Sequence, residues 1–165
     1  MNPSKRKLIQ GARSAARLAA VQGLYQMDLA ATDIADVLHD LTATKLRDAV
    51  RQDGEEELEL TDPDQTFLAE LLRGVVRLQR DIDPMIDNQL ATGWRLERVD
   101  SILRAILRAA SYELIERTEV PARVVINEYI DVARAFLEGD DPRVVNGVLD
   151  KLARRLRPDE FAATS

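Results

Sequence analysis

The sequence predicts an all-α protein of about seven helices, and three observations support this fold class. Apolar side chains recur every three or four residues, the period of an α-helix, in one stretch after another. Proline, aspartate and glycine stand between these stretches, where helices begin and end. No stretch shows the period of two that is typical of a half-buried strand. Because 165 residues suffice for one core, we expect residues 1–165 to fold as a single helical domain.

The first expected helix lies at the basic end of the chain. Residues 1–27 hold five basic residues and no acid, although the whole chain has a net charge of −6. If this helix begins early enough, four side chains fall within a sector of roughly 60° and could line a row of phosphates: Arg6, Gln10, Arg13 and Arg17. The opposite side carries small residues that let a neighbouring helix approach closely: Ala12, Ala15, Ala16, Ala19 and Gly23. We expect residues 1–20 to form a basic, partly flexible segment, with a solvated chain end as the alternative to a binding site.

Two further helices flank an acidic segment. The spacing of Ile34, Val37, Leu38 and Leu41 predicts a second helix, which we expect to run to about Arg51. Residues 52–64 contain seven acids and no base, a composition that indicates a solvated loop. Asp62 and Pro63 then provide a cap and a first-turn proline for a third helix. Its apolar stripe comprises Phe67, Leu71, Val75, Leu78 and Ile82.

The middle of the chain predicts a short fourth helix and a long fifth one. Asp83 and Pro84 repeat the start signal, and Met85, Ile86 and Leu90 follow at helical spacing. We expect Trp94, the only tryptophan, to fill the core. Residues 96–117 carry the most apolar stripe, so we place this fifth helix at the centre of the bundle, with Arg98, Arg104 and Arg108 leaving the core.

Two amphipathic helices around a polar corner complete the prediction. Pro121 suits the first turn of the sixth helix, and its stripe comprises Val125, Tyr129, Val132 and Phe136. Gly139 ends that helix, while Asp141 and Pro142 begin the seventh, whose stripe comprises Val145, Val148, Leu149 and Leu152. Gly147 lies inside the seventh helix, where glycine costs roughly 1 kcal/mol relative to alanine. Close packing against a neighbouring helix is the simplest explanation for it.

The residues do not predict an enzyme or a cofactor. There is no cysteine, and His39 is the only histidine, so neither a thiolate site nor a histidine cluster is possible. Asp83 and Asp87 could form a carboxylate pair, but Asp83 is better explained as a helix cap. Glu113 and Glu128 are expected to accept structural hydrogen bonds. No run of about 18 apolar residues and no signal peptide is present, and we expect a cytoplasmic protein without a membrane span.

Several sequence elements resemble the NusB family. Residues 125–129 contain its INE element, and residues 145–151 read VNGVLDK. Residues 106–108 match its ILR element, residues 112–114 match its YEL element, and residues 20–25, AVQGLY, match its VQALY-like element. Because these elements occur in the family's order and spacing over nearly the whole chain, the resemblance is highly specific.

The resemblance implies a fold of two packed helical subdomains, divided near the acidic loop, and a function in transcription antitermination. With its partner NusE, a small ribosomal protein, such a protein binds boxA RNA of nascent transcripts, especially of ribosomal RNA operons. It then joins the antitermination complex of RNA polymerase. The resemblance assigns RNA binding to six residues: Arg6, Lys7, Arg13, Arg17, Gln22 and Tyr25. The first four would contact phosphates and the last two would contact bases.

The resemblance also implies a partner site and two departures from the family pattern. Asp140 matches a position where NusE docks. Ser14 and Ala15 stand where some members have consecutive arginines, which predicts a lower intrinsic RNA affinity. Leu103 stands where many members carry an acid.

Two other functions stay open at this point. An accessory domain of a ribosomal RNA methyltransferase can share these helices, but we expect no catalytic domain in the few residues after Leu156. A protein-interaction bundle without RNA binding is suggested by the sparse arginines and the net negative charge. It predicts that Arg13→Ala and Arg17→Ala leave RNA affinity unchanged. The oligomeric state, including a homodimer, also stays open.

Overall fold

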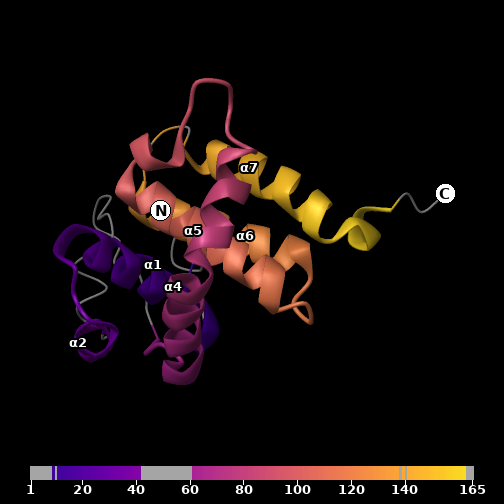
Figure 1. Cartoon of the computed structure of the whole chain (residues 1–165). Coiled ribbons are helices and arrows are strands. Elements are labelled where there is room, and N and C mark those ends of the chain that lie inside the picture. Colours follow the sequence, from indigo (N-terminus) through magenta and orange to yellow (C-terminus); the bar gives the residue numbers. More distant parts are fainter. Residues whose placement is uncertain (1–8, 10, 42–60, 138, 140, 163–165) are drawn as a thin grey trace.

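The computed structural model describes residues 9, 11–41, 61–137, 139 and 141–162 (Figure 1). Within these residues there are six α-helices, two short 3-10 helices and no strand. The α-helices are α1 (Ala12–Ala30), α2 (Ile34–Asp40), α4 (Gln65–Asp87), α5 (Ser101–Glu116), α6 (Ala122–Phe136) and α7 (Asp141–Leu156); the 3-10 helices are η2 (Leu96–Arg98) and η3 (Pro158–Phe161). The all-α prediction is confirmed, and its count of about seven helices is close to the six described.

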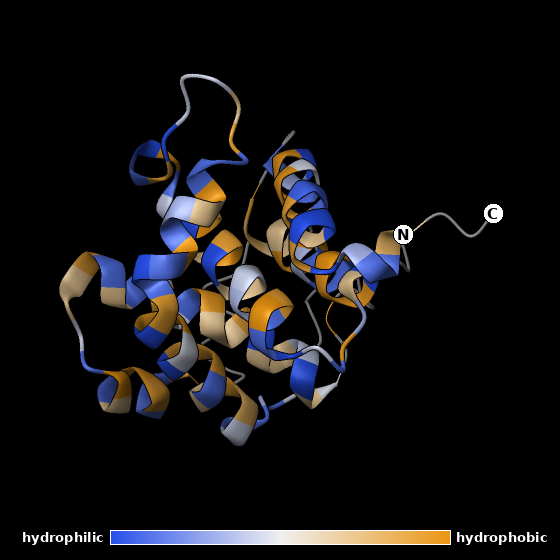
Figure 2. Cartoon of the chain, turned by 45° about the vertical axis from the view of Figure 1, so that its right-hand side comes forward, coloured by the Kyte–Doolittle hydropathy of each residue, from blue (hydrophilic) through white to orange (hydrophobic). Residues whose placement is uncertain are grey.

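Helix α5 lies at the centre of the bundle, as its apolar sequence predicted. It contacts α1 and α4 on one side and α6 and α7 on the other (Figure 1). Helix α2 packs against α1 and α4. Hydrophobic and hydrophilic segments alternate along the helices (Figure 2), so each helix can turn an apolar face inward. One continuous apolar cluster draws side chains from all six α-helices.

The small residues of α1 allow it to run through the interior. Residues 14–21 are buried on every side of the helix. A Cβ atom at Gly23 would lie 2.9 Å from Cγ1 of Val37 and 3.2 Å from Cδ2 of Leu72, so only glycine fits there without a shift. The predicted close approach along this face is therefore confirmed.

Helix α4 corrects two expectations about helix starts. Asp64, not Asp62, caps it, and its carboxylate accepts the Phe67 N–H at 3.0 Å. The helix also continues through Pro84 to Asp87, so the separate fourth helix was wrong. Ile82 and Ile86 lie four residues apart and are both fully buried. This continuous apolar stripe outweighs the single hydrogen bond that a proline removes near a helix end.

Two further expectations about the middle of the chain were wrong. The predicted fifth helix is interrupted after η2, because Asp100 accepts the N–H groups of Ile102 and Leu103 and starts α5 anew. Trp94 is 49% exposed and does not fill the core. Nothing lies within 4 Å of a Cβ built on Gly147, so close packing does not explain that glycine.

Several expectations fall on residues outside the described ranges. These are the extension of the second helix from residue 42 to 51, the acidic loop up to residue 60, the chain before Ile9, and Asp140. Gly139 has a φ of +68°, which suits its expected place between α6 and α7. In the part of the chain that the structure describes, no helix has both the length and the apolar character needed to cross a membrane.

Candidate nucleic-acid interface

The expected RNA-binding residues of α1 lie at its two ends, separated by its buried middle. Arg13 is exposed in the first turn, whereas Gln22 and Tyr25 are half-buried toward the other end. Helix α1 begins at Ala12, after Gly11 at a φ of +86°, and of the four side chains expected in one sector the structure describes only Arg13 and Arg17. Arg6, Lys7 and Asp140 are outside the described residues.

Arg17 faces the interior instead of solvent. Its side chain is only 4% exposed, and its guanidinium donates to Glu113 through two parallel hydrogen bonds of 2.8 and 2.9 Å. A third contact places Nη1 at 3.3 Å from Oε1 of Glu128. Arg17 cannot reach a phosphate while these bonds are intact. Its role is therefore to hold α1 in place, and it does not form part of the exposed surface.

Glu113 is the centre of this buried polar network. Its side chain is fully buried, and it also accepts a 2.5 Å hydrogen bond from the hydroxyl of Tyr129 on α6. Beside it, the Ser14 hydroxyl donates to Glu128 at 2.9 Å. The expectation that both glutamates accept structural hydrogen bonds is confirmed. Together these bonds tie α1 to α5 and α6.

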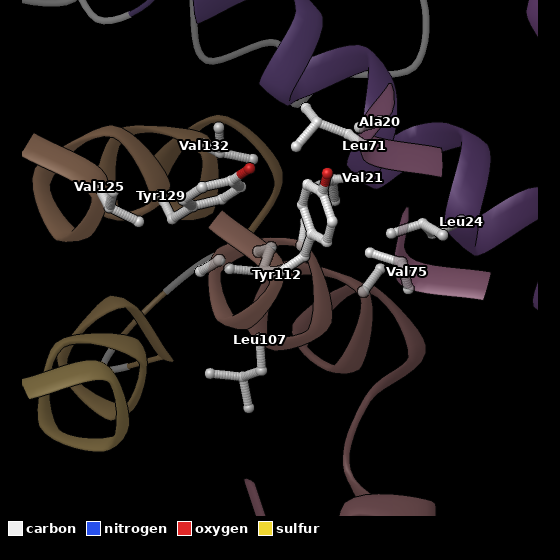
Figure 3. Close-up of a cluster of buried hydrophobic side chains, with 14 of the residues drawn as sticks. Ala20, Val21, Leu24, Leu71, Val75, Leu107, Tyr112, Val125, Tyr129 and Val132 are labelled. Atoms are coloured by element: carbon white, nitrogen blue, oxygen red, sulfur yellow. The ribbon is translucent and has the colours of Figure 1, made fainter. Parts of the chain in front are cut away.

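Burial and charge set the protonation states in the network. Burial raises the pKa of Tyr129 well above its usual value, and the negative charge of Glu113 raises it further. Burial alone would lower the pKa of Arg17, but the hydrogen bond and the charge of Glu113 outweigh it and raise that pKa. Tyr129 is therefore a neutral donor and Arg17 a cation near neutral pH. Figure 3 shows Tyr129 in a cluster of apolar side chains from α1, α4, α5 and α6.

The ring of Phe67 gathers three arginines near the start of α1. The guanidinium carbons of Arg13, Arg17 and Arg117 lie 5.2, 5.1 and 4.9 Å from its centroid. Arg117 also pairs with Glu70 at 3.3 Å and with Glu119 at 3.2 Å. Arg13 has no carboxylate partner among the described residues, so its charge stays available to an anion while the aromatic ring orients it.

A second set of ion pairs joins the other end of α1 to α5. Arg104 donates to Asp28 through Nε at 3.1 Å and Nη2 at 2.5 Å, and through Nη1 to the carbonyls of Leu96 and Glu97. Asp28 lies three residues after Tyr25, so the two are neighbours on the surface of α1. Arg104 therefore fixes this end of the interface against the segment that precedes α5.

The two aspartates considered as a catalytic pair have structural partners. Asp83 receives two hydrogen bonds of 2.9 Å from Arg108, so its interpretation as a helix cap was wrong. Asp87 accepts the Leu96 N–H at 2.6 Å. Among the described residues, no three histidine or acidic side chains come together in a way that could hold a metal ion.

Sequence reasoning missed the role of Arg157. This side chain is 7% exposed and donates to the carbonyls of Glu113 at 3.0 Å, Leu114 at 3.0 Å and Arg117 at 2.8 Å, and to that of Val120. It thereby gives the carbonyl of Leu114 a donor that the end of α5 does not supply, and it adds a second donor to the carbonyls of Glu113 and Arg117, which also accept the backbone N–H groups of Arg117 and Val120. Nothing in the basic sequence around it distinguishes Arg157 from its exposed neighbours, Arg154 and Arg155.

Comparisons with known proteins identify relatives of this chain. The model of the NusB family matches residues 14–154. A transcription antitermination protein NusB from Rhodopseudomonas palustris strain BisB18 is 48% identical over 150 residues, covering 91% of this chain and 86% of the relative. Another from Bartonella tribocorum is 48% identical over 145 residues, covering 88% and 90%.

Solved structures show the same fold. The chain resembles T. maritima NusB with a TM-score of 0.73 and 24% identity, over 93% of this chain and 99% of that one. A structure described as antitermination factors NusB and NusE in complex with dsRNA matches with a TM-score of 0.69 and 21% identity, over 86% and 96%. The family match and the close relatives, each spanning most of the sequence, show that this chain belongs to the NusB family.

Proposed function

We propose that this chain is a transcription antitermination factor that binds boxA RNA together with NusE and joins the antitermination complex of RNA polymerase. Membership of the NusB family supports this function, as do relatives almost half identical in sequence that are named for it. A protein of the same fold occurs in a complex of NusB, NusE and RNA. In this function the protein acts in the cytoplasm, as one helical domain of residues 1–165, by binding and not by catalysis, and it requires no cofactor.

The observation that carries the RNA-binding proposal is the environment of Arg13. Its guanidinium is exposed, oriented by the Phe67 ring and without a carboxylate partner in the described part of the chain. In an otherwise acidic protein, such a charge suits a phosphate. We assign phosphate contacts to Arg6, Lys7 and Arg13, and base contacts to Gln22 and Tyr25. Arg17 becomes a positioning residue that holds α1 against α5.

The two groups of contacts are well separated. Arg13 and Tyr25 are twelve residues apart on α1, which corresponds to about 18 Å of helix. A bound RNA must therefore extend along the molecule, and single-stranded RNA can do so while exposing its bases. NusE would complete the site beside Asp140, where the family resemblance places its docking position.

The test is a fluorescence-anisotropy titration of a labelled boxA-like RNA and a scrambled control, with and without NusE, over a salt series. We expect a preference for boxA that NusE sharpens. Arg13→Ala should reduce the slope of log affinity against log salt by about 0.7, the value for one phosphate contact to single-stranded nucleic acid. Arg155→Ala, which removes an exposed charge on α7, serves as the matched control and should leave the slope unchanged.

A different result would favour the protein-interaction bundle. Equal weak binding of both RNAs, unaffected by NusE and by Arg13→Ala, would contradict the proposed function. The burial of Arg17 is the observation that favours this alternative, because it removes one cation from the expected phosphate contacts.

A further inference from the structure

A groove lies beside the loop that connects α4 to α5, which is the loop at the top of Figure 1. Its volume is about 340 Å³, and Trp94, Arg95, Arg98, Val99, Leu103 and Asp141 are among the residues that line it. Leu103, only 3% exposed, belongs to the core beneath it. The lining of the groove therefore combines apolar side chains, an aromatic ring, two arginines and two aspartates.

Trp94 is the most unusual residue of the groove. It is the only tryptophan of the chain, and it leaves 49% of its surface exposed. Gly93, at a φ of +89°, turns the backbone immediately before it. A large exposed ring of this kind offers a flat face on which a nucleic-acid base can stack.

The arginines of the groove differ from those nearby. Arg95 and Arg98 are exposed, and neither forms an ion pair in the described part of the chain, whereas Arg104 and Arg108 are both paired. Residues 88–99 hold these two arginines and a single acid, Glu97, so the loop is locally positive in an acidic protein. Unpaired cations beside an aromatic ring are complementary to a phosphate that follows a stacked base.

Two aspartates, Asp100 and Asp141, also line the groove and balance its two arginines in formal charge, but they differ from the arginines in their partners. The carboxylate of Asp100 is occupied, since it accepts the first N–H groups of α5 at 2.9 and 3.3 Å. Asp141 is half-buried at the start of α7 and can accept a hydrogen bond from the amino group of a base. The volume lies at the lower end of the range for small-ligand pockets, which suits one nucleotide better than a folded partner element.

One side chain joins the segment beside the groove to the end of α1. Arg104 binds Asp28 at the end of α1 and, through the same guanidinium, the carbonyls of Leu96 and Glu97 in the groove's own segment. The end of α1, which carries Tyr25, is therefore held against the segment that follows Trp94. We therefore expect an RNA strand that passes Tyr25 to continue toward this loop.

We propose that this groove binds one unpaired nucleotide of RNA, whose base stacks on Trp94 and whose phosphate lies between Arg95 and Arg98. This subsite rests on the proposed RNA-binding function and extends it beyond the residues of α1. It makes the loop between α4 and α5 a determinant of how far along the RNA the protein reaches.

Trp94 itself is the probe for the first experiment, since no other tryptophan contributes to the emission. The full-length protein is titrated with an unlabelled boxA-like RNA, and a labelled copy reports affinity by anisotropy. We expect RNA to change the Trp94 emission with the same concentration dependence as the anisotropy. Trp94→Ala should weaken binding by about 5- to 150-fold, and Trp94→Phe should retain most of the affinity because a ring remains.

The charge contacts are tested separately. The double variant Arg95→Ala with Arg98→Ala should reduce the salt slope by about 0.7, the value for one phosphate, and each single variant should reduce it by less, whereas Arg155→Ala should leave it unchanged. Circular dichroism confirms that each variant folds, which the exposure of these side chains makes the expected result.

The outcomes separate this subsite from the function on which it rests. RNA binding by anisotropy with unchanged Trp94 emission, and unchanged affinity in Trp94→Ala, would overturn the subsite and leave the RNA-binding function standing. No RNA binding under any condition would overturn both. A change of Trp94 emission with NusE alone, beyond the sum of the separate spectra, and none with RNA would show a protein-docking groove instead and also overturn the subsite.

Discussion

The two ends of α5 use the same chemistry in different environments. At the C-terminal end, Glu113 is fully buried and Arg17 is 4% exposed, and their paired hydrogen bonds lie among apolar side chains. At the N-terminal end, Arg104 and Arg108 bind Asp28 and Asp83, which are 31% and 29% exposed. Both ends form arginine–carboxylate pairs, but only one is shielded from water. The comparison predicts that burial, more than the choice of residues, decides how much each end of α5 contributes to the stability of the fold.

The largest expected effect is at the buried end. Glu113→Ala leaves Arg17 as an unpaired buried cation and removes the acceptor of the Tyr129 hydroxyl, so the free energy of unfolding should fall by about 3–5 kcal/mol. Urea unfolding followed by circular dichroism measures it. Glu128→Ala is the matched control, because the side chain of Glu128 is 23% exposed and its loss should cost clearly less. Equal losses of unfolding free energy in the two variants would contradict the distinction between the buried Glu113 and the more exposed Glu128.

Arg157→Ala should have the next largest effect. It leaves the carbonyl of Leu114 without its side-chain donor and removes one of the two donors to the carbonyl of Glu113, so we expect the free energy of unfolding to fall by about 1–3 kcal/mol. Arg157→Lys keeps the charge but not the planar fork, so it should recover only part of the stability. Thermal unfolding of both variants tests this, and full recovery by lysine would show that charge alone matters at this site.

At the exposed end, the cap of α5 should have a smaller effect. Asp100→Ala removes the acceptor of two backbone N–H groups and should cost about 1 kcal/mol. Asp100→Asn retains a capping oxygen and should cost little. The midpoints of urea unfolding measure the difference, provided that the free energy of unfolding depends on urea with the same slope in both variants. A cost for Asp100→Ala that matches that of Glu113→Ala would contradict the contrast between the two ends.

The smallest expected effect is that of the partly exposed ion pair between Arg104 and Asp28. Arg104→Ala should lower the free energy of unfolding by about 1 kcal/mol or less, because solvent screens its pair with Asp28. The loss should shrink further in high salt, whereas that of Glu113→Ala should not. Unfolding measured at two salt concentrations checks both. A salt-independent loss from Arg104→Ala would show that this end is as shielded as the other.

Most of the fold could be predicted from the sequence because amphipathic periodicity is local. The central place of α5 followed from its apolar stripe, and the close contact at Gly23 followed from the small residues of α1. The prediction failed where packing overrides local signals. A proline signals a helix start, yet Pro84 stays inside α4 because Ile82 and Ile86 continue one buried stripe.

The candidate site could be predicted only in part. The exposure of Arg13 agreed with expectation, but the burial of Arg17 did not. Its partner, Glu113, is 96 residues away in the sequence, and no spacing reveals such a pair. Trp94 was expected in the core because large aromatic rings are usually buried there. Its exposure depends on how the loop leaves α4, which no periodic pattern encodes.

The contacts of Arg157 have a consequence for how the protein forms during synthesis. The N-terminus of the chain leaves the ribosome first, so α5 emerges well before Arg157, which donates to carbonyls at its C-terminal end. Arg157 follows Leu114 by 43 positions, and until it is made the carbonyl of Leu114 lacks the donor that it has in the folded protein, while the carbonyls of Glu113 and Arg117 have only the backbone N–H groups of Arg117 and Val120. The central helix can therefore reach its final hydrogen bonding only after α6 and α7 have been made.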